Sequence, residues 1–353
     1  MDVSKIDKNF AVKSATEFIS DKYDASEEPF TVYGGFFEKE RKFEKMPLNV
    51  AQAISPSIVW GSGCGAGIRI TFSTDSKIIR LHADIRKKCF VHNMCFTSSS
   101  CFALSEDENG KTKFIGNFVG DKTDGVNTCD AELTLKGGKL RDYELFLPLY
   151  SGVDYLSLEF EKGSEVKKYE KYKGKKKILY YGSSITQGGC ASRADNTYQQ
   201  LVSEWTGYDY TILGFSGSAK AEDGMIEYIK NYDCDIFVCD YDHNAPTPEY
   251  LLATHEKLYK AFRDNPYHTN VPVVFISCPD GRRFEKGEER FEIIRQTYEN
   301  AKGKGENVYL IDGRTFYPED IYAHCSVVGC HPTDLGFYFM AKKIYDVIKG
   351  VKI

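Results

Sequence analysis

The sequence lacks long apolar runs and an excess of basic residues. No stretch of about 18 apolar residues, the length that crosses a bilayer as a helix, occurs in the 353-residue chain. Residues 1–18 contain no apolar core of the kind found in signal peptides, so we expect a cytoplasmic protein with no membrane partner. Lysine and arginine number 46 against 51 aspartate and glutamate residues, for a formal net charge of -5. This balance gives no electrostatic reason to expect nucleic acid as a partner.

Zinc-type cysteine spacing is also absent. The 11 cysteines are spread over the whole chain, and none belongs to a Cys-x-x-Cys pair. Because their number is odd and their spacing irregular, we expect reduced thiols that pack as small apolar side chains. The acidic stretch DYDHN, residues 240–244, has no second ligand cluster at matching spacing, so the sequence predicts no metal site.

The first half of the chain has the pattern of a β-rich domain. Residues 30–160 contain short segments of β-forming residues separated by turn residues, such as SIVWGSGCGAGIRITFST and KIIRLHADIR. Ile68, Ile70 and Phe72 alternate with polar residues, which indicates a strand with one buried face. About seven such strands, with no convincing helix between them, predict an antiparallel, jelly-roll-like β-sandwich at residues 1–165. No cluster of titratable residues stands out in this segment, so binding or scaffolding is its expected role.

Residues 166–177 separate this pattern from the next. The stretch KGSEVKKYEKYKGKKK, residues 162–177, consists almost entirely of charged residues, glycine and tyrosine. We interpret it as a solvated linker rather than a nucleic-acid-binding segment, because the rest of the chain is acidic. A chain of 353 residues is long enough for a domain on each side of such a linker.

From residue 178 onward, apolar strands alternate with amphipathic helices. The segment KILYYG is typical of a buried strand and TYQQLVSEW of a helix, and the alternation continues to the last helix, DLGFYFMAKKIYDVIKG. About five strands and as many helices predict a three-layer α/β domain with a parallel sheet, residues 178–353. Functional residues of such sheets gather where strands end. Three strands end in polar loops that contain glycine or asparagine: GSSIT, GFSGS and DYDHNAP.

Together these loops resemble the sequence blocks of the SGNH hydrolases, also called GDSL esterases. The first block, GDSxT, appears as GSSIT at residues 182–186, and the glycine of the second block as Gly217. The asparagine of the third block appears as Asn244 and the histidine of the last as His331. The resemblance covers residues 176–353 and implies a flavodoxin-like parallel sheet. The preceding β-rich segment adds a likeness to the acetyl esterases of carbohydrate esterase family two, which also have a β-sandwich ahead of the hydrolase domain.

The resemblance implies a role for each of these residues. Ser184 would be the nucleophile, and His331 the base that takes its proton and returns it to the leaving alcohol. The backbone N–H groups of Ser184 and Gly217 and the side-chain amide of Asn244 would form the oxyanion hole. Ser183 stands where the family has aspartate, and we expect it to cap the following helix.

The sequence departs from the family pattern at the residue that usually orients the histidine. The last block of the family is DxxH, but the residue three positions before His331 is Val328, whose side chain accepts no hydrogen bond. We therefore expect a Ser–His dyad in which a backbone carbonyl accepts from the histidine, as the resemblance to family-two carbohydrate esterases implies. Asp242 and Asp334 are alternatives, although we expect Asp334 to cap the last helix. His243 is a rival base that we interpret as part of the pocket wall.

These features predict a serine esterase that removes a small acyl group, with acetyl as the first expectation, from a carbohydrate or similar hydroxyl. The substrate would be a small-molecule or oligosaccharide ester, and the chemistry requires no cofactor or metal. The sequence does not indicate an oligomeric state. Two alternatives stay open. One is a weak or inactive carbohydrate-binding protein of the same fold, which Val328 favours. The other is a flavodoxin-like nucleotide binder that would hold phosphate in the loop GSSITQGG.

Overall fold

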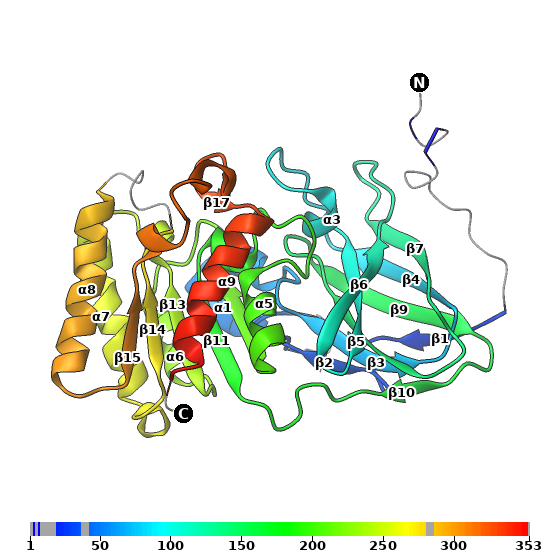
Figure 1. Ribbon diagram of the computed structural model, residues 1–353, viewed down its shortest axis with the longest axis horizontal. Helices are drawn as coiled ribbons and strands as arrows, with labels where there is room; N and C mark the ends of the chain where they lie inside the picture. Colours follow the sequence, from blue (N-terminus) through cyan, green and yellow to red (C-terminus); the bar gives the residue numbers. More distant parts are fainter. Residues whose placement is uncertain (1–2, 4–5, 8–18, 37–41, 280–285, 352–353) are drawn as a thin grey trace.

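A β-sandwich and an α/β unit lie side by side along the longest axis of the protein (Figure 1). The structure is a computed structural model that describes residue 3 and residues 6–7, 19–36, 42–279 and 286–351. Among these residues, no helix combines the length and the apolar character needed to cross a bilayer. The cysteines are free thiols, and most of them are buried.

The β-sandwich consists of two antiparallel sheets. One sheet has the strand order β1-β9-β4-β7, and the other has the order β10-β3-β8-β5-β6 with β2 also paired to β3. Alternate side chains of both sheets, including Phe72, Leu104 and Phe160, are buried between them and form one apolar cluster. The predicted sandwich is therefore confirmed. Its strands are β1 (Ser20–Asp24), β2 (Thr31–Tyr33), β3 (Arg69–Thr74), β4 (Ile78–Ile85), β5 (Phe102–Glu108), β6 (Lys111–Phe118), β7 (Thr128–Thr134), β8 (Arg141–Phe146), β9 (Val153–Glu161) and β10 (Val166–Lys168).

Short helices interrupt this segment, contrary to the prediction that no helix separates its strands. Between β2 and β3 lie α1 (Leu48–Ile54) and α2 (Pro56–Ser62), and α3 (Phe96–Ser99) precedes β5. Ser55 caps α2 by accepting a hydrogen bond from the Ile58 N–H at 3.3 Å. The apolar residues of SIVW resemble a strand in sequence, but Ile58 is buried against the α/β unit in the cluster that contains Phe215. Helices of seven residues are too short to establish a helical period in the sequence.

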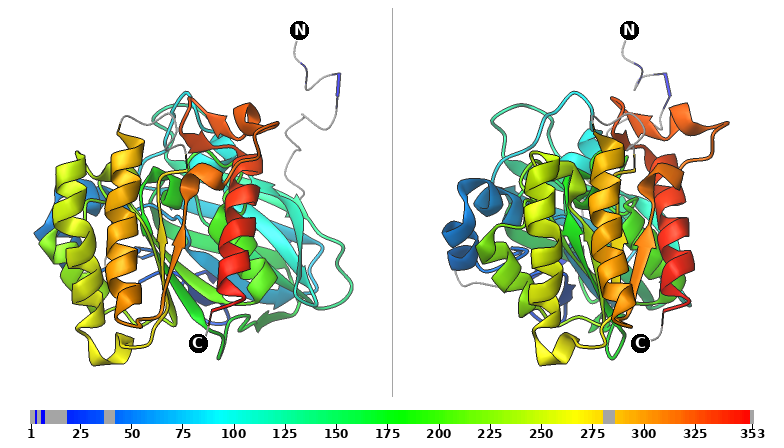
Figure 2. Two further views of the ribbon diagram at one scale, coloured as in Figure 1. Left: turned by 60° about the vertical axis from the view of Figure 1, so that its left-hand side comes forward. Right: turned by 90° about the vertical axis from the view of Figure 1, so that its left-hand side faces the viewer.

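The α/β unit contains a five-stranded parallel sheet of order β12-β11-β13-β14-β15. Helices α5 and α9 cover one face of the sheet, and α6, α7 and α8 cover the other (Figure 2). This is the flavodoxin-like architecture that the sequence predicts. The strands are β11 (Lys177–Gly182), β12 (Asp209–Gly214), β13 (Ile236–Asp240), β14 (Val273–Ile276) and β15 (Val308–Ile311), and the hairpin before the last helix is β16 (Ser326–Val327) and β17 (His331–Pro332). The helices are α4 (Ser184–Gln187), α5 (Tyr198–Thr206), α6 (Asp223–Lys230), α7 (Pro248–Arg263), α8 (Gly287–Gly303) and α9 (Asp334–Ile348).

The two parts share an apolar core. Phe146 and Leu149 of the β-sandwich belong to the same buried cluster as Ile178 of β11 and Ile212 of β12. Arg69 of β3 is completely buried in this interface. Its guanidinium donates to the Asp209 carboxylate at 2.7 Å and to the Tyr210 carbonyl at 2.9 Å, and it lies over the Tyr210 ring.

The predicted linker, residues 166–177, packs against the β-sandwich in part. Its first residues form β10, which pairs with β3. The Tyr172 hydroxyl is buried and donates to Glu144 at 2.9 Å, and the Lys171 ammonium lies 2.7 Å from the same carboxylate. The interpretation of this stretch as a solvated connector is wrong for these two residues, because β8 supplies a buried charge for them to pair with. The domain limits at residues 165 and 178 stay a prediction.

Candidate active site

The candidate site is a cavity at the carboxyl end of the parallel sheet, where β11, β12 and β13 end. Its volume is about 280 Å³. The four predicted site residues, from four separate segments of the chain, all line it. The lining residues are Ser184, Ile185, Ser216, Gly217, His243, Asn244, Cys330 and His331.

Ser184 and His331 are in direct contact. Ser184 is the first residue of α4, and Ser183 before it caps this helix by accepting from the Ile185 N–H at 3.2 Å. The cap role expected for Ser183 is thereby confirmed. His331 is the first residue of β17, and its Nε2 atom lies 2.8 Å from Ser184 Oγ. With the histidine proton on Nδ1, this contact lets the serine hydroxyl donate to Nε2, which is the arrangement that a general base requires.

Gly217 and Asn244 present donor groups to the same cavity. Gly217 has a φ of +69°, and a Cβ placed on it would meet no atom within 4 Å. The space above its backbone is therefore open to a substrate, and the left-handed conformation suits glycine. The Asn244 Oδ1 atom accepts from the Ala219 N–H at 3.2 Å. Its amide NH₂ group is consequently the end that remains to donate to a ligand.

Two buried residues without a role in the sequence prediction fix these loops. Gln187 is fully buried, accepts from the Ser216 N–H at 2.9 Å and donates to the Leu149 carbonyl at 3.1 Å. Asp240, at the end of β13, accepts from the hydroxyls of Thr186 and Tyr198 at 3.1 and 3.2 Å. Burial raises the pKa of Asp240 to about 7. The sequence signal for Gln187 is only its position directly after the GSSIT block.

The second ring nitrogen of His331 faces a thiol. Nδ1 lies 3.2 Å from the Sγ atom of Cys330, whereas we expected a backbone carbonyl as its partner. Burial lowers the pKa of His331 below its ordinary value of 6.5. Val328 is 62% exposed in the turn between β16 and β17, with a φ of +51°. An apolar side chain in that position contributes nothing to the orientation of the imidazole.

The two aspartates considered as substitutes are held by other partners. Asp242 forms a buried ion pair with Arg290 at 3.0 Å and accepts from the Cys278 N–H at 2.9 Å. Asp334 accepts from the Ser192 N–H at 2.8 Å. The expectation that Asp334 caps α9 is wrong, because Thr333 occupies that position and accepts from the Gly336 N–H at 3.3 Å.

His243, the rival base, forms part of the cavity wall. Its Nε2 atom lies 2.9 Å from Cys278 Sγ. Burial lowers the pKa of His243 to about 4, so its imidazole is neutral near pH 7. Ser184 Oγ makes its ring contact with His331 and not with His243.

The β-sandwich also reaches the site. The Tyr150 hydroxyl, from the loop after β8, donates to the Ser184 carbonyl at 3.3 Å. Beside it, the Trp60 ring of α2 lies 6.2 Å from the Tyr150 ring and is 47% exposed. The first part of the chain therefore contacts the backbone of the segment that carries Ser184.

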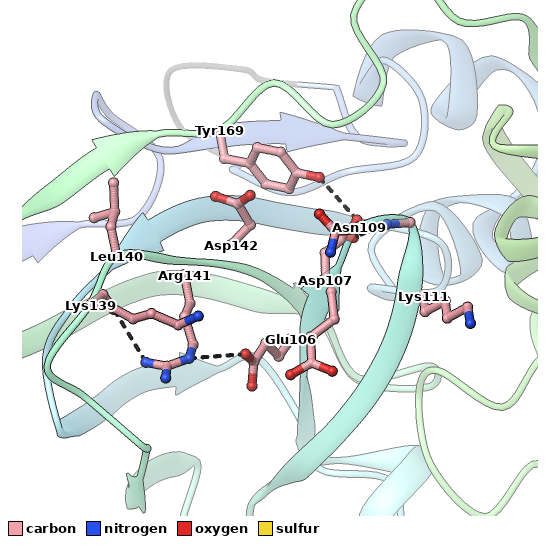
Figure 3. Close-up of a pocket in the computed structure, with 11 residues that line it drawn as sticks. Glu106, Asp107, Asn109, Lys111, Lys139, Leu140, Arg141, Asp142 and Tyr169 are labelled. Atoms are coloured by element: carbon pink, nitrogen blue, oxygen red, sulfur yellow. Dashed lines mark hydrogen bonds and ion pairs between the residues drawn. The ribbon is translucent and has the colours of Figure 1, made fainter.

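A larger polar cavity, of about 550 Å³, lies at the ends of β5 and β8 in the β-sandwich (Figure 3). Arg141 pairs with Glu106 at 3.2 Å, and the Tyr169 hydroxyl donates to Asp107 at 3.0 Å. The expectation that this part contains no titratable cluster is wrong, because the cluster draws on segments that are distant in sequence. Within the described ranges, no three His, Cys, Asp or Glu side chains are grouped so as to hold a metal ion.

Both parts of the chain match family models of esterases. Residues 175–349 match the GDSL-like Lipase/Acylhydrolase family. Residues 21–166 match a model described as the N-terminus of SGNH-hydrolase-type esterases. The chain belongs to the SGNH hydrolases. It is accordingly a carboxylic ester hydrolase, and this decides against the flavodoxin-like nucleotide binder.

Several solved structures share the fold of nearly the whole chain. A protein from Bacteroides ovatus described as a GDSL-like lipase has a TM-score of 0.83 and 26% identity, over 95% of this chain and 99% of that chain. A salicylyl acyltransferase from a tetracycline biosynthetic pathway has a TM-score of 0.76 and 17% identity, over 94% and 98%. A family-two carbohydrate esterase from Cellvibrio japonicus has a TM-score of 0.58 and 13% identity, over 95% and 98%. No curated protein sequence matches this SGNH hydrolase.

Proposed function

We propose that this SGNH hydrolase removes a small acyl group, in the first place acetyl, from a hydroxyl of a carbohydrate or similar polyol. The reaction uses Ser184 as nucleophile and His331 as base. The observation that carries the proposal is the 2.8 Å contact between Ser184 Oγ and His331 Nε2 in a cavity lined by Gly217 and Asn244. A nucleophile and its base must lie within hydrogen-bond reach of each other for this chemistry.

The reaction proceeds in two halves. Ser184 Oγ attacks the ester carbonyl carbon as its proton passes to His331 Nε2, and the carbonyl oxygen becomes an oxyanion. The N–H groups of Ser184 and Gly217 and the Asn244 amide donate to this oxyanion. The C–O bond to the alcohol then breaks, and His331 returns its proton to the departing oxygen. Water repeats the sequence on the acyl-serine, releasing the carboxylic acid and free Ser184.

The dimensions of the site favour a short acyl group. The cavity of about 280 Å³ also has to accommodate part of the alcohol. The similarity in fold to a family-two carbohydrate esterase supports the same class of substrate.

The test is hydrolysis of p-nitrophenyl acetate by the wild type and by Ser184→Ala. We expect the variant to lose at least about 10³-fold in kcat, because the nucleophile is gone while the oxyanion hole remains. Ser183→Ala is the matched control. It removes the neighbouring hydroxyl and a helix cap, and we expect it to stay within about 10-fold of the wild type.

Two outcomes would contradict the proposal. Equal, near-background rates for the wild type and Ser184→Ala would favour a carbohydrate-binding protein without turnover. A kcat/KM that rises from p-nitrophenyl acetate to the octanoate ester would contradict the small acyl group. Release of acetate from an acetylated oligosaccharide then tests the alcohol part of the substrate.

A further inference from the structure

In the family pattern, the aspartate of the last block orients the catalytic histidine. In this structure, a thiol lies beside the corresponding ring nitrogen of His331. We propose that Cys330 is the positioning residue of His331: its sulfur accepts the hydrogen bond from Nδ1 and so keeps Nε2 directed at Ser184. This inference rests on the proposed esterase reaction. It gives this SGNH hydrolase a Ser–His–Cys arrangement in place of the expected dyad on a backbone carbonyl.

The contacts of the imidazole ring carry the inference. Nε2 lies 2.8 Å from Ser184 Oγ and Nδ1 lies 3.2 Å from Cys330 Sγ, so a side-chain partner holds each ring nitrogen. Both contacts suit the neutral tautomer with the proton on Nδ1, in which Nε2 accepts from the serine hydroxyl and Nδ1 donates to the sulfur. This is the tautomer that the base needs before it takes the serine proton.

The backbone of the β16–β17 hairpin places this sulfur. Val328 and Gly329 both have positive φ, at +51° and +82°, and the Cys330 N–H closes the turn on the Val327 carbonyl at 3.4 Å. The turn directs Val328 outward and returns the chain so that Cys330 lines the cavity. The loss of an acid at position 328 and the presence of a thiol at position 330 therefore belong to one local geometry.

A thiol and a carboxylate at position 330 would have different effects on the pKa of His331. Within the part of the chain that the structure describes, the ionisable groups near this pair include His243, which interacts with His331, and Cys190, which interacts with Cys330. Asp334, which follows in α9, is bound to Ser192. A carboxylate beside Nδ1 would favour the imidazolium and raise the pKa of His331, whereas burial beside a neutral thiol lowers it.

The experiment compares the wild type with Cys330→Ala, Cys330→Ser and Cys330→Asp in kcat and in the pH dependence of kcat/KM on p-nitrophenyl acetate. Cys330→Ala should lose about 10-fold in kcat, the effect of one ordinary hydrogen bond, with KM little changed. Cys330→Ser, which retains an acceptor, should recover most of that loss. Cys330→Asp should stay active and move the acid limb of the profile up by about 1 pH unit or more. Cys95→Ala, an exposed cysteine outside the cavity, is the control and should match the wild type.

The outcomes distinguish this inference from the esterase proposal. If Ser184→Ala loses activity while Cys330→Ala matches the wild type in kcat and pH profile, the esterase proposal stands and the role of Cys330 is refuted. If Ser184→Ala retains activity and Cys330→Ala does not, the thiol is the nucleophile, and both the esterase mechanism with Ser184 and the positioning role of Cys330 are wrong.

Nitrogen-15 NMR of the His331 ring gives a readout independent of turnover. The proton should reside on Nδ1 in the wild type and distribute between both nitrogens in Cys330→Ala, and an unchanged tautomer in the variant would also refute the role.

Discussion

Burial gives the carboxyl group of Asp240 a pKa of about 7, against an ordinary value of 3.8. The side chain lies under α4, where the hydroxyls of Thr186 and Tyr198 donate to it. Desolvation disfavours the charged form more than these two hydrogen bonds favour it. At neutral pH the folded protein therefore holds a partly protonated carboxyl group directly beneath the helix that presents Ser184.

This raised pKa makes the stability of the protein depend on pH. Between about pH 4 and pH 7 the folded state keeps a proton that the unfolded state loses, so the free energy of unfolding falls as the pH rises. Asp240→Asn removes this dependence. We expect the variant to gain about 2 kcal/mol more relative to the wild type at pH 8 than at pH 5, in urea unfolding.

Comparing the two pH values cancels any constant effect of the amide on packing. Asp235→Asn, at the other end of β13 and partly exposed, is the matched control for replacing a carboxylate. A gain of Asp240→Asn that is the same at both pH values would show that this carboxyl group is ionised throughout the range.

The sequence identifies site residues only where they belong to a motif of the family. Ser184, Gly217 and Asn244 could be predicted to meet because parallel strands end at one edge of the sheet. His331 could be added because it matches the last block of the SGNH hydrolases and precedes the closing helix, which begins at the same edge. Cys330 and its contact with the imidazole could not, because the turn geometry that directs the sulfur inward depends on positive φ values at two preceding residues. A thiol beside a histidine carries no signal of its own in a chain with 11 cysteines.

At the scale of elements, the loops of the site are joined by α4, although this helix has only four residues. Gln187, its last residue, accepts from the Ser216 N–H and donates to the Leu149 carbonyl. One side chain thus connects the first loop of the α/β unit to the second loop and to the β-sandwich. The residue next to Ser216 is Gly217, whose N–H we assign to the oxyanion hole.

Replacement of Gln187 by alanine should affect both catalysis and stability. Without the amide, the Ser216 N–H and the Leu149 carbonyl lose buried partners, which costs about 1–3 kcal/mol in the free energy of unfolding. The loop of Gly217 is released as well, so we expect kcat to fall about 10-fold through misplacement of an oxyanion donor. Thermal unfolding and steady-state kinetics on p-nitrophenyl acetate measure the two effects.

The control for this prediction is Gln296→Ala, on the exposed side of α8, where the amide bonds to Asn300. It should leave both quantities unchanged. A Gln187→Ala protein with reduced stability and full kcat would show that the Gly217 loop holds its position without the glutamine.

The length and the apolar pattern of each element decide whether it could be predicted from the sequence. The helices α7, α8 and α9 are long and regular in pattern. The apolar residues of the parallel strands and their helices form two buried clusters, one on each face of the sheet. The helices α1 and α2 were missed because their apolar residues pack onto the α/β unit and not within the sandwich. Contacts between the two parts of the chain do not produce a periodic apolar pattern in helices as short as these.

At the scale of the whole molecule, the interface between the β-sandwich and the α/β unit is apolar, buried and closely packed, like the core of a single domain. Gly67 lies so close to Ile212 of β12 that a Cβ on it would come within 2.9 Å of that side chain. Leu149 and Tyr150 of the β-sandwich are buried with Ile178 and Ile185. Neither part could be separated without exposing a large apolar area, so we expect the chain to unfold as one cooperative unit.

Arg69 provides the test of this cooperativity. Its guanidinium is buried between the sheets and paired with Asp209 at 2.7 Å, so Arg69→Ala leaves a carboxylate without its partner in the interface. Breaking one side of a buried pair costs about 3–5 kcal/mol, and calorimetry should show a single unfolding transition at a lower temperature. Asp209→Asn in the Arg69→Ala background should recover part of the loss, because the unpaired charge is removed.

The control is Arg80→Ala, in a partly exposed pair with Glu132, which should change the free energy of unfolding by no more than about 1 kcal/mol. Two separate transitions in the wild type, with only one of them shifted by Arg69→Ala, would show instead that the β-sandwich and the α/β unit fold independently.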